Sequence, residues 1–424
     1  MKGWFSVPQF SLPFGKTQLS IEAPETGFLG TFLPQRAEDM SAEVERLTVA
    51  QALDNPIGAS QLETLVSSGQ TVTILASDLT RPCPNAALLE PLLDRLLRGG
   101  VKERDITVVI GLGLHRQMSS AELMQTVGSR VFKRVRVVNH DINDTVKVGT
   151  TSRGTPVAVS RLAVEADFLI ATGNVEFHYF AGFSGGAKAL VPGAASDVTI
   201  RSNHALMIQD GAEAAAIVGN PVREDLEEAA DFVGIDFILN AIVDEEHAVV
   251  TAAAGGVQQA HRHLCEQLAT LGIVQVPQFL DTAIVSAGGF PKDINLYQAQ
   301  KALDNTAAVV KHGGTLVLLA ACPEGFGSET FSDWLMRGRS TGELLEDLKK
   351  SFVLGGHKAA AIARAAQRID ILLVSETPLT EGSLTGLTEF RSAQAAVDAA
   401  VTKAGKTGIY GVFPRGASTL PRVK

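Results

Sequence analysis

A single lysine, Lys188, stands in a run of glycines and small residues, HYFAGFSGGAKALVPG (178–193). His178 precedes this lysine by ten residues, and His204 follows it by sixteen. A lysine in such a loop could neutralise a phosphate or, if it is removed from water, form a covalent bond to a cofactor. The histidines add groups that transfer protons or bind metals near neutral pH. The segment therefore indicates a site for an anionic or covalently attached ligand.

The glycines before the lysine suggest how such a ligand would fit. Gly182, Gly185 and Gly186 lack the side chain that keeps a bulky group away from the backbone. Their amide N–H groups could also face an anion. We therefore expect Gly185 and Gly186 to contact the ligand.

Two common phosphate-binding motifs are incomplete in this sequence. A P-loop requires G-x-x-x-x-G-K-[ST], but Ala189 follows Lys188, so the hydroxyl that binds magnesium is missing. GLGLHR (111–116) is close to a dinucleotide fingerprint, but Arg116 replaces the third glycine, which allows close packing of helix on sheet. Nucleoside triphosphate hydrolysis and dinucleotide binding are therefore disfavoured.

His204 lies in SDVTIRSNHALMI (196–208), which is expected to form a helix capped by Ser196 or Asp197. No second His, Asp or Glu stands beside it at metal-ligand spacing. If His204 binds a metal, groups from outside the protein must supply the other ligands. A core or surface role for a lone helical histidine remains the alternative. Arg201, one turn earlier, could bind substrate, bind a cofactor phosphate or lie in solvent.

The elements that position these residues follow a recurring pattern. A short apolar run is followed by a polar or glycine-rich loop and then by a helical stretch. The apolar runs comprise residues 71–76, 105–110, 166–171, 282–287, 315–320 and 370–375. Strands that alternate with helices predict an α/β protein with mainly parallel sheets covered on both faces.

Several polar residues follow the first three apolar runs. They are Asp78, Arg81, His115, His178 and Lys188. In open α/β sheets, ligands bind beyond the carboxyl ends of the strands. We therefore expect these five residues to form one site, although loop packing or capping would account for any one of them alone.

The composition narrows the class of protein. The 424 residues include 37 Lys and Arg against 46 Asp and Glu, a formal net charge of −9, which argues against nucleic acid or an anionic membrane as partner. Cys83, Cys265 and Cys322 are too few and too scattered for a disulfide framework or a cysteine-rich zinc site. The sequence has neither an apolar signal region nor a membrane-spanning stretch, so we expect a cytoplasmic protein.

Taken together, the loops resemble those of one family. The matching stretches cover most of the chain in the family's order: SDLTRPCP (77–84), GLGLHR (111–116), GNVEFHYFAGFSGGAKALVPGAAS (173–196), NHALM (203–207), GNPVRED (219–225) and SAGGFPKDINLYQAQKAL (286–303). The sequence resembles the nickel-pincer nucleotide-dependent lactate racemases, a family of 2-hydroxyacid racemases and epimerases. The resemblance implies two α/β domains with the active site in the cleft between them.

The resemblance also implies a cofactor, pyridinium-3,5-bisthiocarboxylic acid mononucleotide nickel, which clamps nickel through one carbon and two sulfurs. It would be attached covalently at Lys188, with His204 as the fourth nickel ligand, and separate enzymes would make it. A pincer with three ligands would explain why one protein ligand is enough, and square-planar coordination suits Ni(II). Asp78 and Thr80 would face the cofactor or orient other groups.

Catalytic and substrate-binding roles follow from the same resemblance. His115 and His178 match the family's paired acid–base histidines, and Arg81 would clamp the substrate carboxylate. The second domain would add substrate-facing side chains: Tyr297, Gln298 and Lys301. A solvent-exposed helix face remains the alternative for these three. The implied reaction inverts carbon 2 of lactate or a larger 2-hydroxy acid such as malate, by reversible hydride transfer through a 2-keto acid.

Two other functions remain open. A carrier protein could hold a phosphorylated nucleotide without catalysis, but it would have no use for both His115 and His178. An NAD-dependent hydroxyacid dehydrogenase is disfavoured by the incomplete fingerprint. For the domains, we expect an N-terminal cofactor-binding domain over residues 1–274, rejoined by 410–424, and a C-terminal domain over 275–409.

Overall fold

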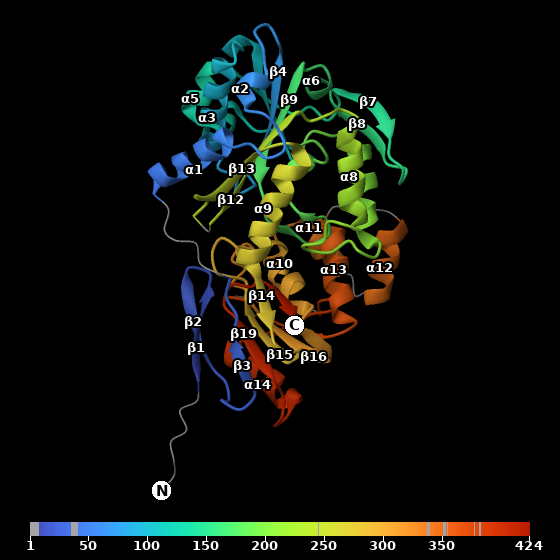
Figure 1. Ribbon diagram of the computed structural model, residues 1–424. Coiled ribbons are helices and arrows are strands. Elements are labelled where there is room, and N and C mark those ends of the chain that lie inside the picture. The colour runs from blue at the N-terminus through green and yellow to red at the C-terminus, as the bar shows by residue number, and fades with distance from the viewer. Residues whose placement is uncertain are drawn as a thin grey trace. The chain divides into compact units, whose positions relative to one another are not determined.

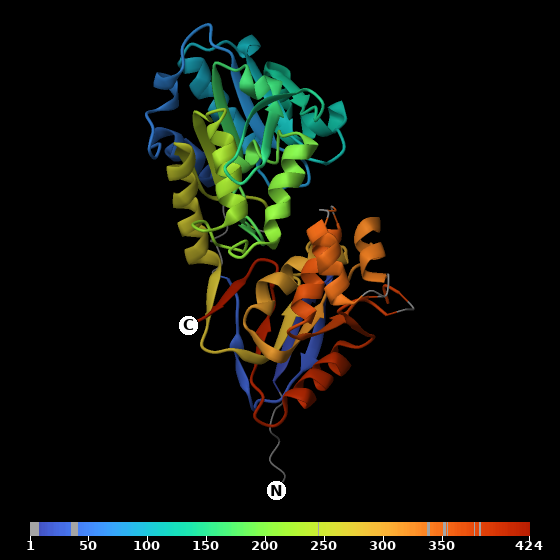
Figure 2. The same cartoon turned by 90° about the vertical axis from the view of Figure 1, so that its right-hand side faces the viewer.

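The computed structural model describes residues 8–34, 41–244, 246–336, 340–350, 353, 355–376, 378–380 and 383–424. The chain forms two compact units, seen from two sides in Figure 1 and Figure 2. We call Arg36–Thr270 the central unit, and Met1–Gln35 with Leu271–Lys424 the terminal unit. Within the described ranges, none of the helices combines the length and the apolar character needed to span a bilayer.

The central unit is built on a six-stranded sheet. Its strands in spatial order are β13 (Val249–Gly255), β12 (Phe237–Val243), β9 (Phe168–Asn174), β4 (Val72–Ser77), β5 (Ile106–Gly111) and β6 (Arg136–Asn139). Neighbouring strands are parallel, apart from the antiparallel β12–β13 pair at one edge. Two small antiparallel pairs accompany the sheet: β7 (Thr145–Thr150) with β8 (Pro156–Ser160), and β10 (Phe177–His178) with β11 (Gly182–Phe183).

Helices cover both faces of this sheet (Figure 1). The helices that begin in this unit are α1 (Ala42–Asp54), α2 (Leu62–Leu65), α3 (Asn85–Arg98), α4 (Ser120–Val127), α5 (Ser129–Arg134), α6 (Arg161–Val164), α7 (Asp197–Ala205), α8 (Pro221–Asp231) and α9 (Val257–Gly272). Three 3₁₀ turns are η1 (Glu103–Asp105), η2 (Gly186–Ala189) and η3 (Leu206–Ile208). Alternate strand residues point to opposite faces, so Ile170 packs in the cluster with α3 whereas Ala171 packs in the cluster with α9.

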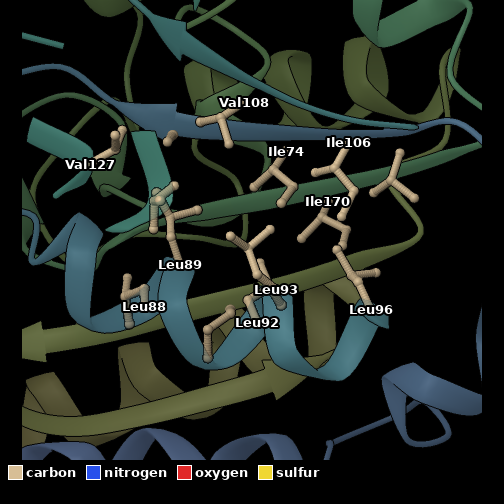
Figure 3. Packing of buried hydrophobic residues seen from close by; sticks show 14 of the residues in the cluster. Ile74, Leu88, Leu89, Leu92, Leu93, Leu96, Ile106, Val108, Val127 and Ile170 are labelled. Atoms are coloured by element: carbon tan, nitrogen blue, oxygen red, sulfur yellow. The ribbon is translucent and has the colours of Figure 1, made fainter. Parts of the chain in front are cut away.

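Helix α3 packs firmly on the sheet because its leucines recur at helical spacing. Leu88, Leu89, Leu92, Leu93 and Leu96 are all buried. Figure 3 shows Leu89, Leu93 and Leu96 pointing at the isoleucine and valine side chains of β4, β5 and β9. Gly99 caps the C-terminal end of the helix.

The terminal unit contains a second six-stranded sheet in which all neighbouring strands are parallel. Its order is β18 (Thr388–Phe390), β17 (Asp370–Val374), β16 (Val310–Leu319), β15 (Leu280–Ser286), β19 (Tyr410–Phe413) and β3 (Phe28–Thr31). Its helices are α10 (Leu296–Ala307), α11 (Glu329–Met336), α12 (Thr341–Lys350), α13 (Gly356–Ala366) and α14 (Ala393–Ala404). A hairpin of β1 (Gln9–Phe14) and β2 (Thr17–Glu22) and a parallel pair of β14 (Ile273–Val276) and β20 (Leu420–Val423) complete it.

The α/β class with mainly parallel sheets is confirmed, but the chain divides differently from the sequence prediction. Residues 410–424 stay in the terminal unit rather than rejoining the N-terminal domain, and residues 8–34 join them there. Strand β3 hydrogen-bonds to β19 at the edge of the second sheet, where the blue strands lie beside red ones in Figure 2. The expected boundary at residue 274 falls inside β14, which pairs with β20. Long-range strand pairing of this kind leaves no local mark in the sequence.

Replacing Leu92 with alanine should lower the free energy of unfolding by about 2–5 kcal/mol, because the change leaves a cavity in a fully buried part of the core. Leu47→Ala on α1 is the matched control: Leu47 is 46% exposed, so its loss should cost less than about 1 kcal/mol. Urea denaturation followed by circular dichroism measures both. Equal losses would contradict the buried position of α3.

Candidate functional site

The candidate site lies at the point in the central sheet where the order of strand addition reverses, between β4 and β9. The chain leaves β4 toward β5 and β6 on one side, and leaves β9 toward β12 and β13 on the other. The loops after β4 and β9 therefore diverge at the carboxyl edge of the sheet, which is the usual ligand position in such folds. The loop after β4 contains Asp78 and Arg81, and the loop after β9 contains His178 and Lys188.

Asp78 and His115 join the loops that follow β4 and β5. Nδ1 of His115 lies 2.7 Å from Oδ2 of Asp78. Because the carboxylate accepts this hydrogen bond, Nδ1 carries the hydrogen and Nε2 of the neutral ring is a proton acceptor. Asp78 is 3% exposed, whereas the His115 side chain is 39% exposed. A buried carboxylate thus orients an accessible imidazole.

The surroundings keep Asp78 ionised. Burial alone would raise the pKa of Asp78, but hydrogen bonds from His115 and Thr80, with the charges of His115 and Arg81, outweigh burial and lower that pKa. Thr80 donates its backbone N–H at 2.7 Å and its hydroxyl at 2.5 Å to Oδ1. The backbone N–H of Arg81 donates to the Asp78 carbonyl at 3.2 Å, which closes the turn.

His178 is held by a different kind of contact. Its Nδ1 accepts a hydrogen bond from the backbone N–H of Ala181 at 3.3 Å. In the neutral ring the hydrogen therefore lies on Nε2, the opposite tautomer from that of His115. Its ring stacks on Tyr179 at 5.5 Å and meets Phe180 edge-on at 4.5 Å between centroids.

Lys188 lies in the 3₁₀ turn η2 among other positive charges. Removal from water lowers the pKa of Lys188 well below its usual value, and the charges of Arg223 and Arg81 lower it further. A lowered pKa favours the neutral amine, which is a nucleophile, over the ammonium ion, which is not. The combination of such a lysine with two guanidinium groups suits a ligand that is both anionic and covalently attached.

The glycines before Lys188 pack closely against the protein itself. Gly185 and Gly186 have φ values of +76° and +61°, which favour glycine. A Cβ atom on Gly186 would lie 3.0 Å from the His261 ring. The backbone N–H of Gly186 donates to Oδ1 of Asn240 at 2.7 Å. The prediction that this amide faces an anion is therefore wrong, because Asn240 already uses it.

His204 lies near the end of α7, the helix that Ser196 caps as predicted. Its ring meets Phe180 edge-on at 5.1 Å between centroids. Among the residues that the structure describes, no three His, Cys, Asp or Glu side chains gather closely enough to hold a metal ion. A metal at His204 would need ligands from another group. Arg201 on the same helix binds Asp197 at 2.7 Å, and both side chains are about half exposed.

Phe180 links three of the predicted site residues, and the sequence patterns did not single it out. It is 3% exposed and contacts the rings of His178 and His204. Nζ of Lys188 lies 5.7 Å from its ring centroid. In the sequence, only the position of Phe180 within the HYFAGFSGGAK segment indicates a part in the site. Phe180 thus spaces the two histidines and the lysine around one ring.

His261 supports the glycine-rich loop from α9. It is 1% exposed, and its Nε2 donates to the Ser184 carbonyl at 2.8 Å, while Nδ1 accepts from Arg262 at 2.9 Å. Arg262 in turn binds both carboxylate oxygens of Glu227 on α8. Burial and nearby positive charges, Arg223 foremost, lower the pKa of His261 well below its usual value. The ring is therefore neutral in the folded protein.

The substrate-facing residues predicted from the second domain lie on α10 of the terminal unit. Tyr297 meets Phe331 edge-on at 5.6 Å, and Nζ of Lys358 lies 4.0 Å from the Tyr297 ring centroid. Gln298 is exposed and Lys301 partly buried. Asn295 caps this helix by accepting from the Gln298 backbone N–H at 3.0 Å. Their part in substrate binding stays a prediction.

Comparison with known proteins decides the family. The lactate racemase N-terminal domain model matches residues 14–216, and the lactate racemase C-terminal domain model matches residues 276–420. The chain is 31% identical over 347 residues, 81% of each protein, to lactate racemase of Thermoanaerobacterium thermosaccharolyticum. It is 33% identical over 325 residues, 76% of each protein, to lactate racemase of Lactiplantibacillus plantarum. The chain belongs to the lactate racemase family.

Membership in this family makes the protein an isomerase and confirms the resemblance inferred from its loops. The structure of the lactate racemase apoprotein from T. thermosaccharolyticum superposes with a TM-score of 0.89 at 28% identity, covering 98% of this chain and 100% of that one. A protein from Thermotoga maritima shares the fold, with a TM-score of 0.63 at 20% identity, 92% of this chain and 100% of its own.

Replacing His261 with glutamine should make stability less sensitive to acid. The folded pKa lies below the unfolded value near 6.5, so below that pH the unfolded chain binds a proton that the folded protein excludes. Stability is therefore complete above about pH 6.5 and falls below it, by up to about 1.4 kcal/mol per pH unit for one histidine. Glutamine retains an N–H donor for Ser184 but does not titrate.

The free energy of unfolding, measured by urea denaturation between pH 7 and 5, should thus fall less steeply in His261→Gln than in the unchanged chain. His263→Gln is the control, because His263 is exposed on the same helix. If His261→Gln left the slope unaltered, the histidine would not be held neutral by the fold.

Proposed function

We propose that this protein is a racemase or epimerase that inverts carbon 2 of a 2-hydroxy acid, either lactate or a larger acid such as malate. The proposal rests above all on two imidazoles, His115 beside Asp78 and His178 in the loop that leads to Lys188. His115 hydrogen-bonds to a carboxylate and His178 to a backbone N–H, so their neutral rings present opposite tautomers. Both named relatives are lactate racemases, which supports lactate as a substrate.

The chemistry of the substrate favours a hydride route. The α-hydrogen of a 2-hydroxy acid is a very weak acid, because the neighbouring carboxylate opposes a second negative charge. If a base takes the hydroxyl proton, the α-hydrogen can leave with its electron pair and a flat 2-keto acid remains. Return of the hydride to the other face of the keto acid inverts the configuration.

His115 is suited to take the hydroxyl proton from one enantiomer. Its Nε2 is the acceptor atom, and a proton gained there creates an imidazolium next to the Asp78 carboxylate at 2.7 Å. Asp78 thus fixes the tautomer and stabilises the charged ring, while Thr80 holds Asp78 in place. The role of Asp78 and Thr80 is therefore orientation of His115.

His178 would serve the other enantiomer. To take the hydroxyl proton, His178 must present Nε2 without a hydrogen, so its ring hydrogen must lie on Nδ1 and the 3.3 Å contact from the Ala181 N–H must give way. The imidazolium ion that forms can return the Nε2 proton to the substrate oxygen and become neutral again. Phe180 and Tyr179 fix the plane of the ring. Racemisation needs a proton-transfer group for each stereoisomer, which explains why two histidines are present.

Arg81 is proposed to bind the substrate carboxylate. It is exposed in the turn that contains Asp78 and Thr80, so its guanidinium can pair with a carboxylate through two hydrogen bonds. Tyr297, Gln298 and Lys301 are proposed to contact the substrate as well, as the family pattern implies.

The donor set fits a nickel-pincer nucleotide. Lys188 supplies an amine with a lowered pKa for covalent attachment, and His204 supplies one imidazole as nickel ligand. Arg81 and Arg223 add positive charge that suits a nucleotide phosphate. When bound, the group would supply the acceptor and donor of the hydride. Separate enzymes that make the cofactor are the partners that this proposal requires.

The proposal is tested by producing the chain together with cofactor-synthesising enzymes and following L-lactate, D-lactate and L-malate by chiral chromatography. We expect either lactate enantiomer to approach an equal mixture of both. A chain that bears nickel and an adduct on Lys188 but changes none of these acids would instead be a carrier protein. Reduction of added NAD with loss of one enantiomer would indicate a dehydrogenase.

Separate variants should distinguish the lysine from the helical histidine. In co-produced Lys188→Ala, intact mass spectrometry should detect no covalent adduct. His204→Ala should retain the adduct mass but lose nickel, because the lysine bond and the nickel bond are independent. Metal analysis per adduct measures this. An adduct on another lysine, or full nickel content in His204→Ala, would contradict the assignments.

Asp78→Asn should slow racemisation by roughly 10² or more, because the amide cannot stabilise an imidazolium as the carboxylate does. Both directions should slow equally, since the equilibrium constant between enantiomers is fixed. Initial rates from each pure enantiomer measure this, and Asp94→Asn is the control, with an Asp side chain that is 60% exposed. Unaltered rates in Asp78→Asn would remove the carboxylate from the mechanism.

A further inference from the structure

The start of α8 contains three polar residues that are fully buried: Asn220, which caps the helix, Arg223 and Asp225. Burial of an arginine and an aspartate is costly unless hydrogen bonds compensate for the lost water. These side chains find their partners in three segments remote in the sequence: the loop that follows His178, the helix that contains His204 and the turn between β7 and β8. The short stretch GNPVRED therefore contacts all three.

Asn220 and Arg223 hold the loop between His178 and Lys188 through its backbone carbonyls. Nδ2 of Asn220 donates to the Phe180 carbonyl at 2.9 Å, while Oδ1 caps the helix. Nε of Arg223 donates to the Ala181 carbonyl at 3.2 Å, and Nη2 donates to the Phe183 carbonyl. A planar guanidinium can bond two carbonyls in fixed directions, which an ammonium group cannot do.

Asp225 holds the helix that contains His204. Its carboxylate accepts from Nδ2 of Asn203 at 2.8 Å and from the hydroxyls of Thr151 and Thr155 at 2.5 and 2.8 Å. Asn203 precedes His204 directly and also donates to the Val222 carbonyl at 3.1 Å. Helix α7 is thus fixed to α8 next to the imidazole.

We infer that Arg223 and Asp225 are positioning residues with separate tasks: Arg223 sets the loop of His178 and Lys188, and Asp225 sets the helix of His204. One helix start thereby fixes the distance between the acid–base group and the metal ligand. The inference rests on the proposed function for its catalytic consequence, but its structural content is independent of it.

In the co-produced holoprotein, Arg223→Lys should lower kcat by roughly tenfold or more and leave nickel per adduct unchanged, since small displacements of a catalytic group are costly. Asp225→Asn should accelerate nickel loss to EDTA by roughly tenfold or more and leave kcat per nickel-loaded chain unchanged. Glu224→Gln is the matched carboxylate control, because Glu224 is 42% exposed on the same helix. A general loss of folding would lower both readouts together in each variant.

Backbone hydrogen–deuterium exchange on the full chain without cofactor tests the positioning separately from the reaction. Arg223→Lys should speed exchange in residues 178–188 but not in 197–206. Asp225→Asn should speed exchange in residues 197–206, and in the turn 151–155 that it also holds, but not in 178–188. If Arg223→Lys fails to fold, Asn220→Asp replaces it, because aspartate retains the cap but loses the donor to Phe180. If Asp225→Asn fails to fold, Thr155→Val removes one of its donors.

The inference is supported if Arg223→Lys changes kcat and exchange in residues 178–188, while Asp225→Asn changes nickel loss and exchange in residues 197–206. We call this the crossed pattern. Equal effects of both variants on both segments, or no effect of either, would overturn it. The crossed exchange pattern in a chain that never racemises lactate would leave the positioning intact and defeat the proposed function instead.

Discussion

The parallel pairing of β4 with β9 is the constraint on which the rest of the site depends. Because the chain leaves these neighbours in opposite directions, their loops diverge at the carboxyl edge of the sheet. Asp78 lies just beyond one strand, and the loop of His178 and Lys188 follows the other. The hydrogen bond from His115 to Asp78 joins the third loop. Residues separated by more than a hundred positions thus meet without long irregular segments.

Positive charge around Lys188 explains why this edge must be held rigidly. Burial and the nearby charges of Arg223 and Arg81 lower the pKa of Lys188, which disfavours its cationic form. A glycine-rich loop has little conformational preference of its own. Asn240 and His261 therefore fix its backbone through hydrogen bonds, and α8 adds further bonds to the preceding carbonyls. The same preorganisation favours an anionic ligand attached at the lysine.

The sequence predicted those features that depend on local pattern. The apolar runs 71–76, 105–110 and 166–171 correspond to β4, β5 and β9, and Ser196 caps its helix. Contacts between remote segments could not be predicted, because no periodicity marks them: β3 completes the second sheet, and Arg223 bonds carbonyls some forty residues away. Gly186 adopts a backbone conformation that favours glycine, as predicted, but its amide N–H donates to Asn240 rather than to a ligand. The partner of a side chain, unlike the position of a strand, can be predicted only when the fold is known.

Isotope transfer during racemisation tests the central claim most directly, namely that His115 and His178 exchange only the hydroxyl proton while the α-hydrogen moves as hydride. The chain bearing its cofactor is incubated with L-lactate in D₂O, and the D-lactate formed is examined by proton NMR and mass spectrometry. The proposed mechanism predicts D-lactate that retains hydrogen at carbon 2. Deuterium at carbon 2 of the product, appearing as fast as the product itself, would show direct deprotonation and contradict it.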